Sequence, residues 1–197
     1  IHQQRCFPII LSDDNQAIAP ILNALERKNK HTQVGIVDNV VEYHKTDTAR
    51  FPLNILLKQK TSFIKNLIFL GIQNYYCSKE SLDILDSLDF EYYRLGETQQ
   101  DIELCEPYLR DQSFVSMNMR AIRSADHPSV LQKNPNGYFA QEFCKITRYV
   151  AMNEQLHCLH LCGFHLDPTT EHQQSAQLIA QLLWFATTGY ESRLNEY

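Results

Sequence analysis

The sequence predicts an α/β fold, specifically a three-layer α/β/α sandwich around a mainly parallel sheet. Short apolar runs alternate with longer segments in which apolar residues recur at helical spacing. The short runs are continuously apolar, as expected of strands that are buried on both faces of a parallel sheet. Six such strands separated by helices indicate βαβ units with helices on both sides of the sheet. The 197 residues suffice for one core, so we expect a single domain over residues 1–197.

Each element has its own local signal. The predicted strands are Phe7–Leu11, Gln33–Val37, Leu67–Ile72, Glu91–Leu95, Ser113–Met119 and Leu156–Leu166. The predicted helices are Gln16–Arg27, a short helix opened by Pro52, helices capped by Ser78 and by Thr98, Phe139–Met152 and Gln173–Tyr190. Ser and Thr favour helix N-caps, and Pro is tolerated in a first turn. A long polar loop is expected from Arg120 to Gly137.

Composition excludes some classes of function. The formal net charge of −5 argues against a dedicated nucleic-acid binder, which would present a basic face. No apolar run approaches the roughly 18–20 residues of a membrane span. None of the six cysteines forms a Cys-x-x-Cys pair. We therefore expect reduced thiols in a cytoplasmic protein that binds neither nucleic acid nor membrane.

Ligands of parallel sheets bind beyond the carboxyl ends of the strands, so the residues that follow the strands are the candidate site. These segments are Ser12–Asn15, Asp38–Glu42, Gly71–Asn74, Ser116–Arg120 and His165–Asp167. The motifs Leu11–Asn15, Asp38–Glu42, Ser116–Arg120, Gly137–Glu142, Phe164–Pro168 and Ser175–Leu178 resemble, in residues and order, the arginase/agmatinase/formimidoylglutamase (ureohydrolase) superfamily, most closely its formimidoylglutamase-like branch. The resemblance runs from Arg5 to Tyr190. It implies that the family's first strand and helix would precede Ile1, as in the C-terminal part of a longer chain.

The resemblance also implies where two Mn²⁺ ions would be bound by two His and four Asp. Those six ligand positions are occupied here, in order, by Asn15, Asp38, Val40, Glu42, Asn118 and Arg120. One ligand is intact, one is conservatively changed, and Arg120 brings a permanent positive charge. About one net negative charge remains where the family supplies four, so we expect no metal cofactor. The family's substrate-binding Glu is His165 here.

These replacements favour a catalytically inactive pseudoenzyme with a structural or regulatory role. We expect Arg120 to replace the metals by pairing with Asp38 and Glu42, which would otherwise repel each other. Members of this superfamily commonly form oligomers, so the resemblance implies a homo-oligomer or a protein partner. The alternative is a divergent hydrolase of non-peptide C–N bonds in linear amidines of the formiminoglutamate, arginine or agmatine type. A binder that keeps the pocket without the chemistry is a third hypothesis.

Several other residues could form functional sites, but a structural role is favoured for them. A zinc site among His157, Cys158, His160, Cys162 and His165 is disfavoured, because alternate residues of a strand face opposite sides.

Asp13 and Asp14 could form a new acid/base pair, although a helix cap is favoured for one of them. Cys77 is expected to be an inert thiol. The pairs Tyr75-Tyr76 and Tyr92-Tyr93 are expected to pack rather than to form a binding platform.

Overall fold

The computed structural model describes residues 8–28, 31–45, 51–58, 63–165 and 170–195. Its centre is a six-stranded sheet in the order β1-β6-β5-β2-β3-β4, in which every neighbouring pair is parallel. The strands are β1 (Ile9–Leu11), β2 (Thr32–Val37), β3 (Ile64–Ile72), β4 (Glu91–Arg94), β5 (Phe114–Asn118) and β6 (Cys158–Cys162). The predicted parallel sheet is thereby confirmed.

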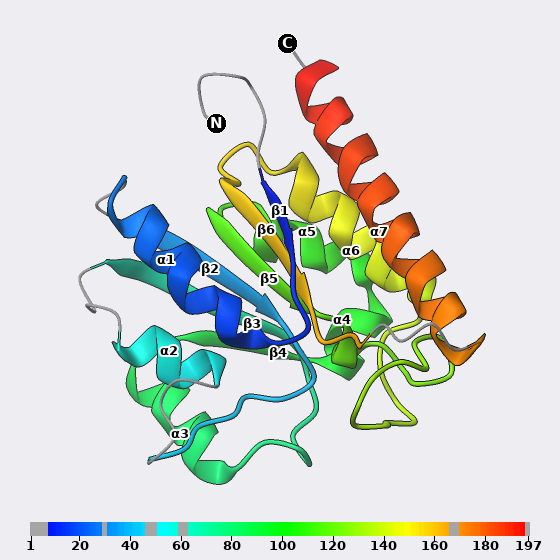
Figure 1. Cartoon of the computed structure of the whole chain (residues 1–197). Coiled ribbons are helices and arrows are strands. Elements are labelled where there is room, and N and C mark those ends of the chain that lie inside the picture. Colours follow the sequence, from blue (N-terminus) through cyan, green and yellow to red (C-terminus); the bar gives the residue numbers. More distant parts are fainter. Residues whose placement is uncertain (1–7, 29–30, 46–50, 59–62, 166–169, 196–197) are drawn as a thin grey trace.

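Helices cover both faces of this sheet (Figure 1). The α-helices are α1 (Ile18–Glu26), α2 (Pro52–Lys58), α3 (Lys79–Ser87), α4 (Leu95–Gln100), α5 (Cys105–Leu109), α6 (Ala140–Met152) and α7 (Thr170–Asn195). The described residues also form the short 3-10 helices η2 (Asn15–Ala17), η3 (Ile102–Leu104) and η4 (Met119–Ala121).

Two separate apolar cores explain the three layers. On β3, Leu67 and Phe69 belong to the core that also contains residues of α1, α2 and α3. Ile68 and Leu70 point to the other face, into the core shared with α4, α5, α6 and α7. Because successive side chains of a strand alternate between faces, a strand in the middle of this sheet must be apolar throughout. The three-layer arrangement follows directly from that pattern.

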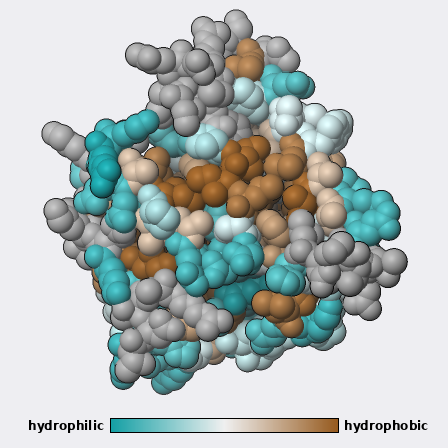
Figure 2. Space-filling model, in the orientation of Figure 1, coloured by the Kyte–Doolittle hydropathy of each residue, from teal (hydrophilic) through white to brown (hydrophobic). Residues whose placement is uncertain are grey.

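The two edges of the sheet differ in character. At one edge, β4 begins and ends with the exposed charges Glu91 and Arg94, which discourage pairing with another strand. At the other edge, β1 has only apolar residues, and its Leu11 is 45% exposed. Figure 2 shows hydrophobic residues gathered across the middle of this face, where β1 lies between α1 and α7. β1 thus has the composition of an interior strand.

Several predicted boundaries were wrong for identifiable reasons. Thr98 does not cap a helix: α4 already begins at Leu95, with Arg94 as its N-cap and Glu97 accepting from the Arg94 backbone N–H. The expected long helix is broken at Asp101, whose side chain caps η3 instead. β6 ends at Cys162, earlier than predicted, because Gly163 takes a positive φ of 81°. Phe7 and Leu166 lie outside the described residues.

The structure bears on two expectations, that the cysteines are reduced and that no segment spans a membrane. The described cysteines, Cys77, Cys105, Cys144, Cys158 and Cys162, are free thiols. Within the described part of the chain, no helix combines the length and apolarity needed to cross a membrane.

Candidate functional site

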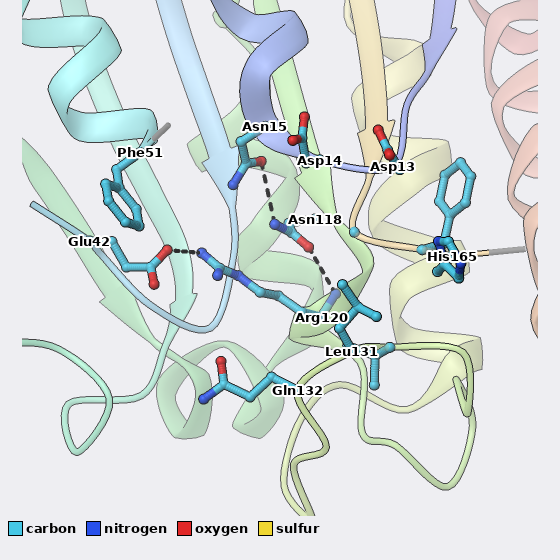
Figure 3. Close-up of a pocket in the computed structure, with 13 residues that line it drawn as sticks. Asp13, Asp14, Asn15, Glu42, Phe51, Asn118, Arg120, Leu131, Gln132 and His165 are labelled. Carbon is cyan, nitrogen blue, oxygen red and sulfur yellow. Dashed lines mark hydrogen bonds and ion pairs between the residues drawn. The ribbon is translucent and has the colours of Figure 1, made fainter. Parts of the chain in front are cut away.

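A cavity of about 450 Å³ lies at the carboxyl edge of the sheet, over the ends of β1, β2, β5 and β6 (Figure 3). It is lined by Asp13, Asp14, Asn15, Glu42, Phe51, Asn118, Arg120, Val130, Leu131, Gln132, Gly163, Phe164 and His165. Five of the seven residues singled out from the sequence are in that lining. The other two, Asp38 and Val40, are buried beside it.

Arg120 is the centre of the site. Its Nε donates to Asp38 Oδ1 at 2.6 Å, and its Nη2 donates to Asp38 Oδ2 at 2.9 Å. The same Nη2 donates to Glu42 Oε2 at 2.9 Å. The predicted pairing of Arg120 with both carboxylates is therefore confirmed. One guanidinium bridges two acidic groups from the end of β2, as its planar, five-donor shape allows.

The three side chains of this bridge are mostly buried. The side chains of Asp38, Arg120 and Glu42 are 1%, 16% and 28% exposed, respectively. Burial raises the pKa of Asp38, and the charge and hydrogen bonds of Arg120 oppose that rise. Burial alone would lower the pKa of Arg120, but the two carboxylates outweigh it and raise that pKa. Arg120 is therefore a cation at neutral pH.

The other half of the site is the uncharged group formed by Asn15, Asn118 and Cys162. Asn118 Nδ2 donates to Asn15 Oδ1 at 3.4 Å, and Cys162 Sγ donates to the same oxygen at 3.0 Å. Asn118 Oδ1 accepts from the Arg120 backbone N–H at 3.0 Å, which joins the two halves. Burial strongly raises the pKa of the Cys162 thiol, so it acts as a neutral donor and not as a thiolate ligand.

Gly163 is required for this packing. A Cβ at this position would lie 1.8 Å from Asn118 Oδ1, and the φ of +81° disfavours any residue with a side chain. The close approach of the β6 end to Asn118 therefore depends on glycine. The sequence interpretation missed Gly163, although its place after a buried strand was a usable signal.

His160 lies beneath the neutral half in a chain of hydrogen bonds. Ser12 Oγ must donate to the Asp14 carbonyl oxygen at 2.6 Å, because a carbonyl only accepts. His160 Nε2 must then donate to Ser12 Oγ at 2.7 Å, and its Nδ1 accepts from Ser116 Oγ at 2.8 Å. Burial lowers the pKa of His160 to about 4, so the ring is neutral. Ser12 is therefore not activated for nucleophilic attack.

A second buried imidazole fastens the loop beside the cavity. His127 Nε2 donates to the Gly163 carbonyl at 3.2 Å, and its Nδ1 accepts from Ser175 Oγ at 3.0 Å. Ser175 Oγ also accepts from the Ser129 backbone N–H at 3.1 Å. These bonds tie the loop that supplies Val130, the β6 end and α7 to one another. Burial lowers the pKa of His127 to about 4.

The remaining sequence candidates can be placed. Asp14 caps η2 by accepting from the Gln16 backbone N–H at 2.9 Å, as predicted for one of the two aspartates. Asp13 lines the cavity. Cys77 accepts from the Val41 backbone N–H, and burial raises its pKa, which agrees with an inert thiol. His165 is exposed at the cavity wall, beyond the end of β6.

The cluster considered for zinc and the tyrosine pairs have other partners. Both ring nitrogens of His160 bond serines, and Cys158 is part of an apolar core. Tyr93 stacks on Tyr108 with ring centroids 3.8 Å apart, as expected for packing. Tyr75 packs edge to face on Tyr76, with ring centroids 4.7 Å apart, although Tyr75 is itself 67% exposed.

The residues present do not fit a pair of divalent metal ions. A guanidinium already bonds both oxygens of Asp38 and one of Glu42, and the neighbouring positions are amides and a neutral thiol. Among the described residues, no group of three or more His, Cys, Asp or Glu side chains is arranged to hold a metal ion. Hard cations need several carboxylates, which this donor set does not supply.

Comparison with solved structures identifies the fold. The chain is similar to formimidoylglutamase from Bacillus subtilis (TM-score 0.79, 20% identity, covering 93% of this chain and 60% of that one). It is similar to Trypanosoma cruzi formiminoglutamase solved with Mn²⁺ (TM-score 0.84, 19% identity, 95% and 66%). It is also similar to agmatine ureohydrolase of Thermoplasma volcanium (TM-score 0.77, 16% identity, 97% and 64%). The arginase-like fold expected from the resemblance is confirmed.

By sequence, no family model and no curated protein matches the chain. The chain spans 60 to 66% of the length of these three solved proteins.

Proposed function

We propose that this chain is a non-catalytic relative of the ureohydrolases with a structural or regulatory role, acting as a homo-oligomer or with a protein partner. The observation that carries the proposal is the bridge from Arg120 to Asp38 and Glu42. A buried cation between two carboxylates performs the charge compensation that two metal ions would otherwise perform. A divalent ion placed beside it would be strongly repelled.

The substrate side of the site supports the same proposal. The resemblance assigns a substrate-binding Glu to the position of His165, which lies in the cavity wall. An imidazole does not hold a cationic amidine as a carboxylate does. Replacement of both the metal ligands and this position is simpler to explain by abandoned catalysis than by a change of metal.

A second candidate is a divergent hydrolase of non-peptide C–N bonds in linear amidines. It is favoured by the cavity of about 450 Å³ that is retained beside Arg120, with Asp13, Asp14 and Glu42 in its lining. Carboxylates in such a position can serve as general acids or bases. The solved neighbours are named as formimidoylglutamase and agmatine ureohydrolase, which sets the reactions to assay.

The decisive experiment is the metal content of the purified chain after incubation with excess Mn²⁺ and removal of free ion. We expect far less than one ion per chain in the wild type. A sixfold variant should gain Mn²⁺ binding: Asn15→His, Val40→His, Glu42→Asp, Asn118→Asp, Arg120→Asp and His165→Glu. The matched control is the fivefold variant that keeps Arg120, which should not bind.

Each outcome decides something. One or two tightly held ions in the wild type would overturn the proposal. Equal binding by the fivefold and sixfold variants would remove Arg120 from the explanation. Turnover of formiminoglutamate, arginine or agmatine by the wild type, at a rate reduced by Glu42→Gln, would establish the second candidate instead.

A further inference from the structure

A second cavity, of about 510 Å³, lies at the same edge of the sheet beyond the ends of β3 and β4. It is separate from the first, and the two share no lining residue. Its walls include Gln73, Asn74, Tyr75, Arg94, Arg123 and Phe139. Nothing in the proposed function uses this space, so a ligand could bind in it whether or not the first cavity is catalytic.

The two cavities have opposite charge. The first contains Asp13, Asp14 and Glu42 against the single cation Arg120. In the second, the charged lining residues are Arg94 and Arg123 alone, although the whole chain has a net charge of −5. Arg123 is partly neutralised by Asp126, at 2.9 Å from its Nη2. Within the described residues, Arg94 forms no ion pair with a carboxylate, so its charge remains available.

Arg94 is held in place by a neutral group. With the Asn74 amide oxygen turned toward it, that oxygen accepts from Arg94 Nη2 at 3.1 Å and from Nε at 3.2 Å. This contact uses one edge of the guanidinium and leaves Nη1 with donors to spare. An orienting amide does not cancel the charge, unlike the carboxylates that hold Arg120. The arrangement suits an arginine that binds an external anion.

The walls are fixed by side-chain amides and contain aromatic surface. Gln73 Nε2 donates to the Asn136 carbonyl at 3.1 Å, and Gln99 Nε2 donates to the Gly137 carbonyl at 3.2 Å. These bonds anchor the loop opposite Arg94. The guanidinium of Arg123 lies 4.1 Å from the centroid of the Phe139 ring, and Tyr75 adds a largely exposed ring. The cavity therefore combines cationic donors with flat apolar surfaces.

We propose that this second cavity binds a small organic anion, a carboxylate or phosphate carried on a planar apolar body. A guanidinium matches both oxyanions in geometry, and an aromatic wall accepts a planar group by stacking. The volume lies within the range typical of small-molecule sites. The unusual exposure of Tyr75 is explained if its ring covers the bound ligand.

Isothermal titration calorimetry of the whole chain with phenyl phosphate, benzoate and uncharged benzamide tests this proposal. We expect one of the two anions to bind with a Kd below about 1 mM, and benzamide not to bind measurably. Arg94→Gln should weaken binding by about tenfold or more, and Arg94→Lys by less, because it keeps the charge and loses the fork.

Lys65→Gln is the matched control, because it removes one exposed positive charge at the opposite end of β3. Binding should be unchanged in that variant. The proposal is overturned if wild-type chain binds neither anion, if benzamide binds as tightly as the anions, or if Lys65→Gln weakens binding as much as Arg94→Gln. The tighter of the two anions identifies the group that the site prefers.

Discussion

The two halves of the candidate site stabilise buried polar side chains in different ways, one by an ion pair and the other by uncharged hydrogen bonds. In the charged half, the buried Asp38 is paired with a cation, Arg120, which also bonds Glu42. In the neutral half, Asn15, Asn118 and Cys162 share uncharged hydrogen bonds and a close approach by Gly163. Both halves lack a metal-binding donor set. The first compensates charge, whereas the second has none to compensate.

This difference predicts different weaknesses. A buried ion pair depends on both partners, and removal of one leaves an uncompensated charge. A neutral, tightly packed group depends on shape and on the satisfaction of its hydrogen bonds. The charged half should therefore respond most to loss of charge, and the neutral half to added volume or added protons.

Removal of the Arg120 cation should have the largest effect. Arg120→Met leaves Asp38 buried beside an apolar side chain, so we expect unfolding free energy to fall by about 3–5 kcal/mol. Urea denaturation measures this loss. Asp38→Asn in the same chain should recover much of the stability, since the fully buried carboxylate is then gone and Glu42, at 28% exposure, can be solvated. Equal losses in the single and double variants would show that packing, and not charge, holds this half together.

Added volume should damage the neutral half somewhat less. Gly163→Ala forces a Cβ into Asn118 and a side chain onto a positive φ, so we expect a loss of about 2–4 kcal/mol. Gly96→Ala is the matched control, because no atom lies within 4 Å of its added Cβ. That variant, in helix α4, should be neutral or slightly stabilised. A tolerated Gly163→Ala would mean that the β6 end moves freely away from Asn118.

Lowering the pH should give the smallest of the three effects on the free energy of unfolding. His160 and His127 have pKa values lowered to about 4 by burial, whereas an unfolded histidine titrates near 6.5. Because the unfolded chain binds these protons first, stability is complete above pH 6.5 and falls as the pH drops toward 4. At pH 5 each histidine should lower the free energy of unfolding by about 2 kcal/mol relative to pH 7.

Denaturant unfolding measured between pH 7 and pH 5 checks this dependence. His160→Gln and His127→Gln should each remove about half of the slope, even where they lower stability at pH 7. Gly96→Ala adds no titratable group and meets no neighbouring side chain, so it should leave the slope unchanged. A slope that survives in the double histidine variant would assign the effect to other groups.

Much of this molecule could be predicted from the sequence because its strands are continuously apolar. The Arg120 bridge was also predictable, since Asp38 and Glu42 at one strand end would repel each other without a cation, and Arg120 is a cation placed at the same edge of the sheet. The cap at Ser78 followed from local chemistry and is present, with its Oγ accepting from the Ser81 backbone N–H.

The errors have a common physical origin in contacts that no local pattern encodes. Thr98 resembles a cap, but its hydroxyl bonds the Leu95 carbonyl and the Tyr138 hydroxyl from inside α4. The early end of β6 accompanies the close approach of Gly163 to Asn118, and the bond from Cys162 to Asn15 joins residues 147 positions apart. Periodicity identifies which face of a strand is buried, but it does not identify the atom that a buried polar group will meet.

The hydrogen bonds of His160 determine how this protein would react with reagents that label the active-site serines of hydrolases. A serine beside an imidazole, with a second hydroxyl on the far ring nitrogen, has the outline of a catalytic triad. Here the Ser12 proton is committed to the Asp14 carbonyl, and the imidazole faces Ser12 with its own N–H. Ser12 should therefore not react with fluorophosphonate labels, which phosphonylate activated serines.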